Sequence, residues 1–212
     1  MRKFTTIILL CSAFSIFSTK ISAQNADVEL LRSINKSSVG SGLRGYSRFI
    51  SNTTTAFSVS TPLVMGAVAL LKKDDDLLKN ALYVGVSLGV DGVVTYSLKE
   101  VVNRPRPNVT YTDIESFESE RAMSFPSGHT SIAFATATSL TLKYPKWYVI
   151  VPSYFWACSV GYSRMNLGMH YPSDVLAGAV VGSGSAYLTY LVNNWFWKKK
   201  NNKKLIGLQA YL

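Results

Sequence analysis

The chain has 212 residues, of which 48% are hydrophobic and 16% are charged, and its mean hydropathy is +0.15. These values are high for a soluble protein and low for a chain made wholly of membrane helices. The formal net charge is +10, but the lysines cluster at the ends of apolar segments rather than along one face, so no nucleic-acid partner is expected. The two cysteines, Cys11 and Cys158, lie in apolar stretches, which argues against a disulfide framework and a cysteine-based metal site.

The first 23 residues have the composition of a secretory signal. Arg2 and Lys3 precede an apolar stretch, and small residues suit cleavage after Ala23. An uncleaved signal anchor is the alternative, and in either case the chain leaves the cytoplasm. Residues 24–48 form a polar periplasmic segment with a short amphipathic pattern, for which we expect a helix at the membrane interface.

Apolar stretches dominate the remainder of the chain, residues 49–212, which we expect to form one domain. Their lengths are at or just below the roughly 20 residues that cross a bilayer. The stretches cover residues 49–71, 81–98, 126–142, 147–162 and 175–197. The prediction is an all-α, membrane-embedded bundle of about five to six transmembrane helices. A soluble helical protein with buried core helices is the alternative.

Positive charge predicts how these helices are oriented, because short loops rich in lysine and arginine stay in the cytoplasm. Lysines at 72–73, at 143 and 146, and after residue 197 all fall on one side when the N-terminus is exported. The loops over 99–125 and 163–173 then both face the periplasm.

Three polar patches gather on that predicted periplasmic side. They read KEVVNRPRP at 99–107, PSGH at 126–129 and SRMNLGMHYPSD at 163–174. A phosphate monoester carries close to two negative charges and needs cationic hydrogen-bond donors around it. Lys99, Arg106 and Arg164 supply three cations from separate segments. Their spacing favours an anion site over positive flanks that merely anchor helix ends.

The PSGH patch lies where an apolar helix is expected to begin. Pro126 suits the first helical turn, where its missing N–H costs nothing. Ser127 and Gly128 would present backbone N–H groups and a hydroxyl to an anion at the helix start, and glycine allows close approach. His129 would then donate a proton to a leaving oxygen.

Taken in order, the patches K-x6-R-P, P-S-G-H and S-R-x5-H-x3-D resemble the type 2 phosphatidic acid phosphatase superfamily. The resemblance implies a helical bundle, with residues 49–212 as its catalytic domain, and a phosphoric monoester hydrolase without an organic cofactor. It implies that His170 is a nucleophile forming a phosphohistidine, that Asp174 orients this imidazole, and that His129 is the general acid. Asp174 also suits the start of the following helix. These three side chains could in principle hold zinc, but the neighbouring cations favour an anion, so no metal is expected.

Some charged residues have no single predicted role. The arginine of the superfamily motif is Arg106, so the role of Arg104 is open. It either adds to the positive electrostatic potential of the site or contacts the substrate. Asp91, inside an apolar stretch, is either functional or paired with a neighbouring helix or a pocket cation. The acidic loop forms either a lid that selects head groups or a solvated loop, and its charged residues are Asp113, Glu115, Glu118, Glu120 and Arg121.

A site beside a membrane surface favours phosphorylated lipids as substrates. Families that share these motifs act on phosphatidic acid, phosphatidylglycerol phosphate, undecaprenyl diphosphate or lipid A. The leader and small size resemble those of a Gram-negative envelope protein, so we expect lipid A dephosphorylation in the bacterial inner membrane, with undecaprenyl diphosphate second. The alternatives are a soluble periplasmic acid phosphatase, a vanadate-dependent haloperoxidase and a non-enzymatic protein that binds lipid phosphates.

Overall fold

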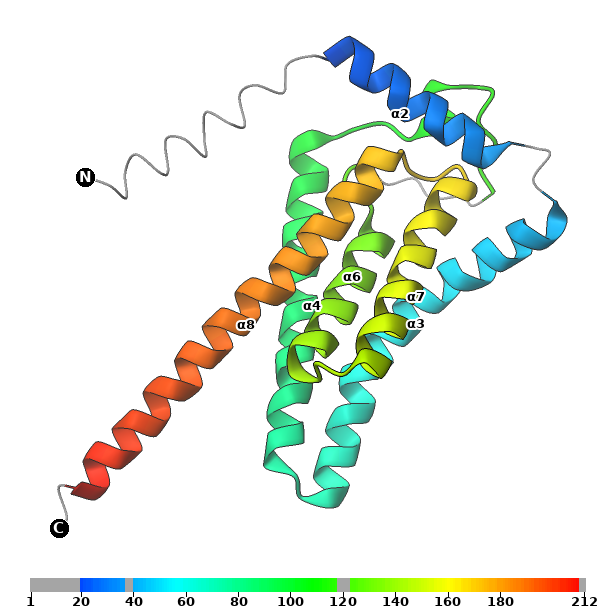
Figure 1. The fold of residues 1–212 in the computed structure, drawn as a ribbon. Helices are drawn as coiled ribbons and strands as arrows, with labels where there is room; N and C mark the ends of the chain where they lie inside the picture. Colours follow the sequence, from blue (N-terminus) through cyan, green and yellow to red (C-terminus); the bar gives the residue numbers. More distant parts are fainter. Residues whose placement is uncertain (1–19, 37–39, 118–122, 210–212) are drawn as a thin grey trace, which may run out of the picture.

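The structure is a computed structural model that describes residues 20–36, 40–117 and 123–209 (Figure 1). Across these residues the chain forms helices and no β-strand, which confirms the predicted all-α fold class. The helices are α2 (Lys20–Asn35), α3 (Ser41–Lys72), α4 (Asp75–Val102), α5 (Pro107–Thr110), α6 (Gly128–Lys143), α7 (Trp147–Asn166) and α8 (Pro172–Gln209). Each predicted apolar stretch lies largely on one of the five long helices from α3 to α8.

Helix α6 is the centre of the bundle, where it packs against α3, α4, α7 and α8 (Figure 1). It is rich in small side chains, and Ala133, Ala135 and Ala137 are fully buried. Helix α8 approaches it closely because glycine stands at the contact. A Cβ added at Gly182 would lie 2.0 Å from the carbonyl oxygen of Ser131. Small residues on α6 and glycine on α8 therefore bring two site-bearing helices together.

The surface of the bundle is apolar and much of its interior is polar, which is the arrangement expected of a protein in lipid. Leu71 is 85% exposed and Val93 is 68% exposed, whereas Thr54 and Ser58 are fully buried. Three helical segments are long and apolar enough to cross a membrane, namely Ser41–Lys72, Asp75–Thr110 and Pro172–Phe196. The chain is therefore a membrane protein, in which α6, of 16 residues, is enclosed by the longer helices.

Helix α2 lies across the end of the bundle at which α4 ends and α8 begins (Figure 1). The predicted amphipathic helix is thus present, but its apolar face packs on protein. Val28 and Leu31 are buried against Ile114 and Tyr171. The loops around the site thus cover this face, and the location of the helix at the membrane interface stays a prediction.

Two predictions lie wholly or mainly outside the described residues. The predicted signal sequence covers residues 1–23. Residues 1–19 of it lie outside the described residues, and α2 begins at Lys20. Three charged members of the acidic loop, Glu118, Glu120 and Arg121, fall there as well. Cleavage after Ala23 stays a prediction.

Candidate active site

The first and third sequence patches meet at His170, which lies in the loop between α7 and α8. Its side chain is 1% exposed. Arg106, the residue that precedes α5, is 4% exposed, and its Nη1 donates to the carbonyl oxygen of Met169 at 2.9 Å. The same Nη1 lies 3.5 Å from Nε2 of His170. One guanidinium thus holds the backbone of the histidine loop and faces one nitrogen of the imidazole.

The other imidazole nitrogen faces a carboxylate. Nδ1 of His170 is 3.7 Å from Oδ2 of Asp174, which is fully buried in the first turn of α8. Ser124 lies beside both groups: its hydroxyl donates to Oδ2 of Asp174 and is 3.4 Å from Nδ1 of His170. The backbone N–H of Tyr171 also donates to this carboxylate, at 3.0 Å. Asp174 therefore stabilises the start of α8 and faces the imidazole at once.

Ser124 is a site residue that the sequence reasoning missed. It is fully buried and stands three positions before the PSGH serine. An uncharged residue outside the motif carries no sequence signal of its own, and its importance comes from the fold that brings it to Asp174.

Burial sets the protonation state of His170. It lowers the pKa of the imidazole from its ordinary 6.5 to about 4, against the opposing effect of Asp174. The positive charges of Arg164 and Arg106 lower this pKa further. At neutral pH the imidazole is therefore neutral. A proton on Nδ1, toward Asp174, leaves the lone pair on Nε2 facing the cations, which is the tautomer a nucleophile needs.

The remaining predicted cations are held by hydrogen bonds from neighbouring helices and loops. Arg164, in the last turn of α7, is fully buried, and its Nη1 donates to Oγ of Ser51 on α3 at 2.7 Å. Lys99, in the last turn of α4, donates from Nζ to the carbonyl oxygen of Met123 at 2.7 Å. Its Cε would be 3.8 Å from a Cβ placed on Gly128. Lys99 therefore lies along the PSGH patch, as an anion cradle requires.

The predicted helix start at Pro126 is wrong. Helix α6 begins at Gly128, Ser127 is its N-cap residue, and Pro126 precedes the helix after a cis peptide bond. The hydroxyl of Ser127 accepts hydrogen bonds from the backbone N–H of Thr130 at 3.5 Å and from its hydroxyl at 2.9 Å. A serine that can cap the helix in this way takes the boundary position in preference to proline.

The capping arrangement changes what the PSGH patch offers an anion. The backbone N–H of Ser127 donates to the carbonyl oxygen of Asp174 at 3.0 Å, so it serves the contact between α6 and α8. The hydroxyl hydrogen of Ser127 and the N–H of Gly128 are suitable donors, because the first N–H groups of a helix have no intrahelical acceptor. His129, in the first turn of α6, is partly exposed, in contrast to the buried His170.

The acidic residues with open roles form pairs within the described part of the structure. Asp91 accepts a hydrogen bond from the hydroxyl of Ser131 at 2.5 Å, so it braces α6 and is not paired with a pocket cation. Asp113 forms an ion pair with Arg32 of α2 at 2.6 Å. Glu115 lies 3.8 Å from Arg44 of α3. The described part of the acidic loop is thus tied to the N-terminal helices.

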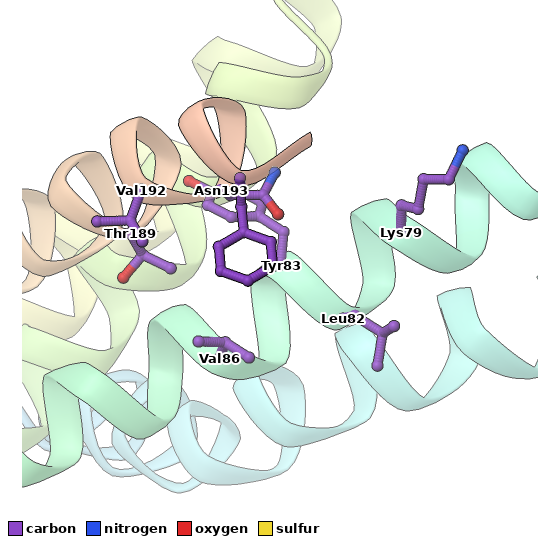
Figure 2. A pocket seen from close by; sticks show the side chains of 8 residues that line it. Lys79, Leu82, Tyr83, Val86, Thr189, Val192 and Asn193 are labelled. Atoms are coloured by element: carbon purple, nitrogen blue, oxygen red, sulfur yellow. The ribbon is translucent and has the colours of Figure 1, made fainter. Parts of the chain in front are cut away.

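A separate pocket lies between α4 and the middle of α8 (Figure 2). It has a volume of about 230 Å³ and is lined by Lys79, Leu82, Tyr83, Val86, Thr189, Val192, Asn193 and Phe196. Tyr83 of the pocket and Lys99 of the candidate site lie on the same helix, about 24 Å apart along its axis at ~1.5 Å per residue. No residue of the three sequence patches lines this pocket, so it is distinct from the candidate site.

The fold and the site together define a class of protein: a membrane enzyme whose buried, neutral imidazole stands between a carboxylate and cations suited to phosphate. A family model described as the PAP2 superfamily matches residues 80–198, more than half of the chain. The chain belongs to this superfamily and is a phosphoric monoester hydrolase.

Known relatives agree on the family and differ in the substrate their names give. An undecaprenyl-diphosphatase from Sulfolobus acidocaldarius is 30% identical over 207 residues, which cover 92% of this chain and 94% of the relative. A lipid A 4'-phosphatase from Bacteroides thetaiotaomicron is 35% identical over 68 residues, 32% of this chain and 30% of the relative.

Two solved structures are similar in fold. The crystal structure of LpxE from Aquifex aeolicus has a TM-score of 0.65 at 25% identity, over 77% of this chain and 93% of that chain. A transmembrane PAP2-type phosphatidylglycerolphosphate phosphatase from Bacillus subtilis has a TM-score of 0.71 at 24% identity, over 92% of this chain and 97% of that chain. At 24% identity, the similarity to the second structure supports a shared fold and nothing further.

Proposed function

We propose that the protein removes phosphate from a lipid at the periplasmic face of a bacterial inner membrane, by way of a phosphohistidine on His170. The observation that carries this proposal is the buried imidazole itself. Nδ1 faces Asp174, while Nε2 lies 3.5 Å from Nη1 of Arg106. A neutral nucleophile directed toward cations is suited to attack an anionic phosphoryl group.

The phosphate would be bound by the three cations and by the start of α6. Lys99, Arg106 and Arg164 supply positive charge, and the hydroxyl of Ser127 with the N–H of Gly128 supplies further donors. This set matches the charge that spreads over the phosphoryl oxygens as the bond to the leaving group breaks.

The reaction would proceed in two displacements. Nε2 of His170 forms a bond to phosphorus as the bond to the leaving oxygen breaks, and His129 donates a proton to that oxygen. Water then attacks the phosphohistidine while His129 accepts a proton from it, which releases inorganic phosphate and restores the neutral imidazole. Asp174 stabilises the positive charge that develops on the imidazole.

Lipid A is the substrate we favour. The apolar outer surface of the bundle suits a substrate whose acyl chains stay in lipid while its phosphate enters the site. A relative named for lipid A 4'-phosphatase activity matches part of the chain. Undecaprenyl diphosphate is the second candidate, because the relative named for that activity matches along 94% of its own length.

Mass spectrometry of lipid A from cells that lack the gene tests this proposal. We expect the deletion to add the mass of one phosphate, and the wild-type gene, but not His170→Ala, to remove it. Unchanged lipid A in the deletion strain would contradict the choice of lipid A. Phosphate release from undecaprenyl diphosphate by the purified enzyme would then identify the second candidate.

A further inference from the structure

Helix α2 brings a second carboxylate to the candidate site. Nη1 of Arg104 donates to Oδ1 of Asp174 at 2.7 Å, and Nη2 of the same guanidinium donates to Oδ2 of Asp27 on α2 at 2.8 Å. Asp174 is fully buried, whereas the side chains of Arg104 and Asp27 are 23% and 10% exposed. One arginine is therefore shared between a carboxylate of the site and a carboxylate of the N-terminal helix.

Asp27 also contacts the residue next to Asp174. The backbone N–H of Ser173 donates to Oδ1 of Asp27 at 2.8 Å, and the hydroxyl of Ser173 donates to Oδ2. Ser173 lies in the first turn of α8, where backbone N–H groups have no acceptor within the helix. Asp27 thus supplies such an acceptor from another segment and fixes the turn that carries Asp174.

Further contacts along α2 hold Asp27 in position. The guanidinium carbon of Arg104 lies 3.7 Å from the ring centroid of Tyr171, which packs with Val28 and Leu31 of α2. At the other end of α2, Nδ2 of Asn35 donates to the carbonyl oxygen of Asn166 at 3.0 Å. Helix α2 is therefore attached to the end of α7 and to the start of α8, on either side of His170.

We infer that Asp27 and Arg104 are positioning residues for Asp174, an inference that rests on the proposed function of the site. Asp27 holds Nη2 of the guanidinium, which leaves Nη1 to bind Oδ1 of Asp174. With Oδ1 engaged, Oδ2 stays directed at Ser124 and at Nδ1 of His170. Arg104 acts on catalysis through Asp174 and does not bind the substrate phosphate.

A kinetic comparison of α2 variants tests this role in the full-length enzyme in detergent micelles, with phosphate release from dioctanoyl phosphatidic acid as the readout. Asp27→Asn keeps the size of the side chain and removes its charge. We expect kcat to fall about tenfold, the kinetic equivalent of one charge-assisted hydrogen bond, with KM within twofold. Asp27→Glu should retain more activity than Asp27→Asn.

The matched control is Asp113→Asn, which breaks the other arginine–carboxylate pair between α2 and the site loops. Arg32 and Asp113 are 45% and 53% exposed, and such pairs contribute little. We expect kcat within twofold of wild type for this variant. Thermal unfolding of both variants separates a loss of α2 docking from a loss of catalytic orientation, because only the latter lowers kcat at unchanged stability.

A double-mutant cycle with Arg104→Gln shows whether Asp27 acts through the arginine. In that background Asp27→Asn should lower kcat less than twofold, since the guanidinium that Asp27 holds is gone and the side-chain oxygen of asparagine can still accept the N–H of Ser173. An equal tenfold loss in both backgrounds would overturn the inference, as would an Asp27→Asn enzyme with wild-type kcat, or an Arg104→Gln enzyme that changes KM alone. A wild-type enzyme that releases phosphate from none of phosphatidic acid, lipid A and undecaprenyl diphosphate would instead overturn the proposed function, and His170→Ala provides the background rate for that distinction.

Discussion

Helices α4 and α8 run from one chemical environment into another. Where α4 ends and α8 begins, the partly buried Lys99 and the fully buried Asp174 are each held by hydrogen bonds. Where α4 begins and α8 continues, the same two helices line the apolar pocket of Figure 2, with Leu82 60% exposed and Val192 61% exposed. The contrast indicates that the candidate site depends on helix ends. There, loops and backbone groups without an intrahelical partner can orient charged side chains.

The buried cations give the largest expected effect at the site end. Arg164→Ala or Arg106→Ala should cost about 3–4 kcal/mol of activation free energy, or ~10²–10³-fold in kcat/KM, because each stabilises charge on the transferring phosphoryl group. Steady-state phosphate release measures this loss. Arg48→Ala removes an exposed arginine of α3 as a control and should change kcat/KM less than twofold. Losses within twofold at Arg106 and Arg164 would reduce them to anchors of the helix ends.

The contact between α6 and α8 gives the next effect. Gly182→Ala places a Cβ 2.0 Å from the carbonyl oxygen of Ser131, so the two helices must separate. We expect a loss of about 1–3 kcal/mol in stability together with reduced activity. Gly184→Ala is the matched control on the same helix, since a Cβ there meets no atom within 4 Å. Thermal unfolding in detergent compares the two, and equal transition temperatures would contradict the close approach.

Ser124→Ala should lower kcat about tenfold, because Asp174 loses a buried hydrogen bond on the oxygen that faces His170. Ser97→Ala, which removes an exposed hydroxyl from α4, should leave kcat unchanged. Both variants are assayed at saturating substrate, so that differences in substrate binding do not affect the measured kcat. A Ser124→Ala enzyme with full kcat would show that the direct approach of Asp174 to the imidazole suffices.

The far end of α4 and α8 should give the smallest effect. Leu82→Ala and Val192→Ala shorten exposed side chains of the apolar pocket and should each change kcat less than twofold. The same phosphate-release assay measures it. A loss as large as that expected for Ser124→Ala would show that the pocket contributes to catalysis, and the contrast between the two ends would disappear.

These variants also mark how far sequence reasoning reaches. The helical bundle follows from the apolar stretches. The spacing of the cations favours Lys99, Arg106 and Arg164 as an anion site, and the resemblance to the superfamily singles out His170. The structure brings Arg106 and Asp174 to this histidine.

Other features depend on tertiary contacts that no local pattern specifies. Asp27 is 77 positions from Arg104 and 146 from Ser173, so its part in the site depends on how α2 docks. Ser124 and the helix boundary at Gly128 depend likewise on contacts with α8 and on a capping hydroxyl. Sequence patterns identify charged motifs, and packing decides which neutral or distant groups support them.

The central claim is that His170 carries the phosphoryl group during turnover. The most direct test mixes the enzyme with ³²P-labelled lipid A, stops turnover rapidly without acid, and locates the label by peptide mapping. We expect an alkali-stable, acid-labile label on His170 in the wild-type enzyme and no label in His170→Ala. A phosphoryl group on any other residue, or turnover retained by His170→Ala, would contradict it.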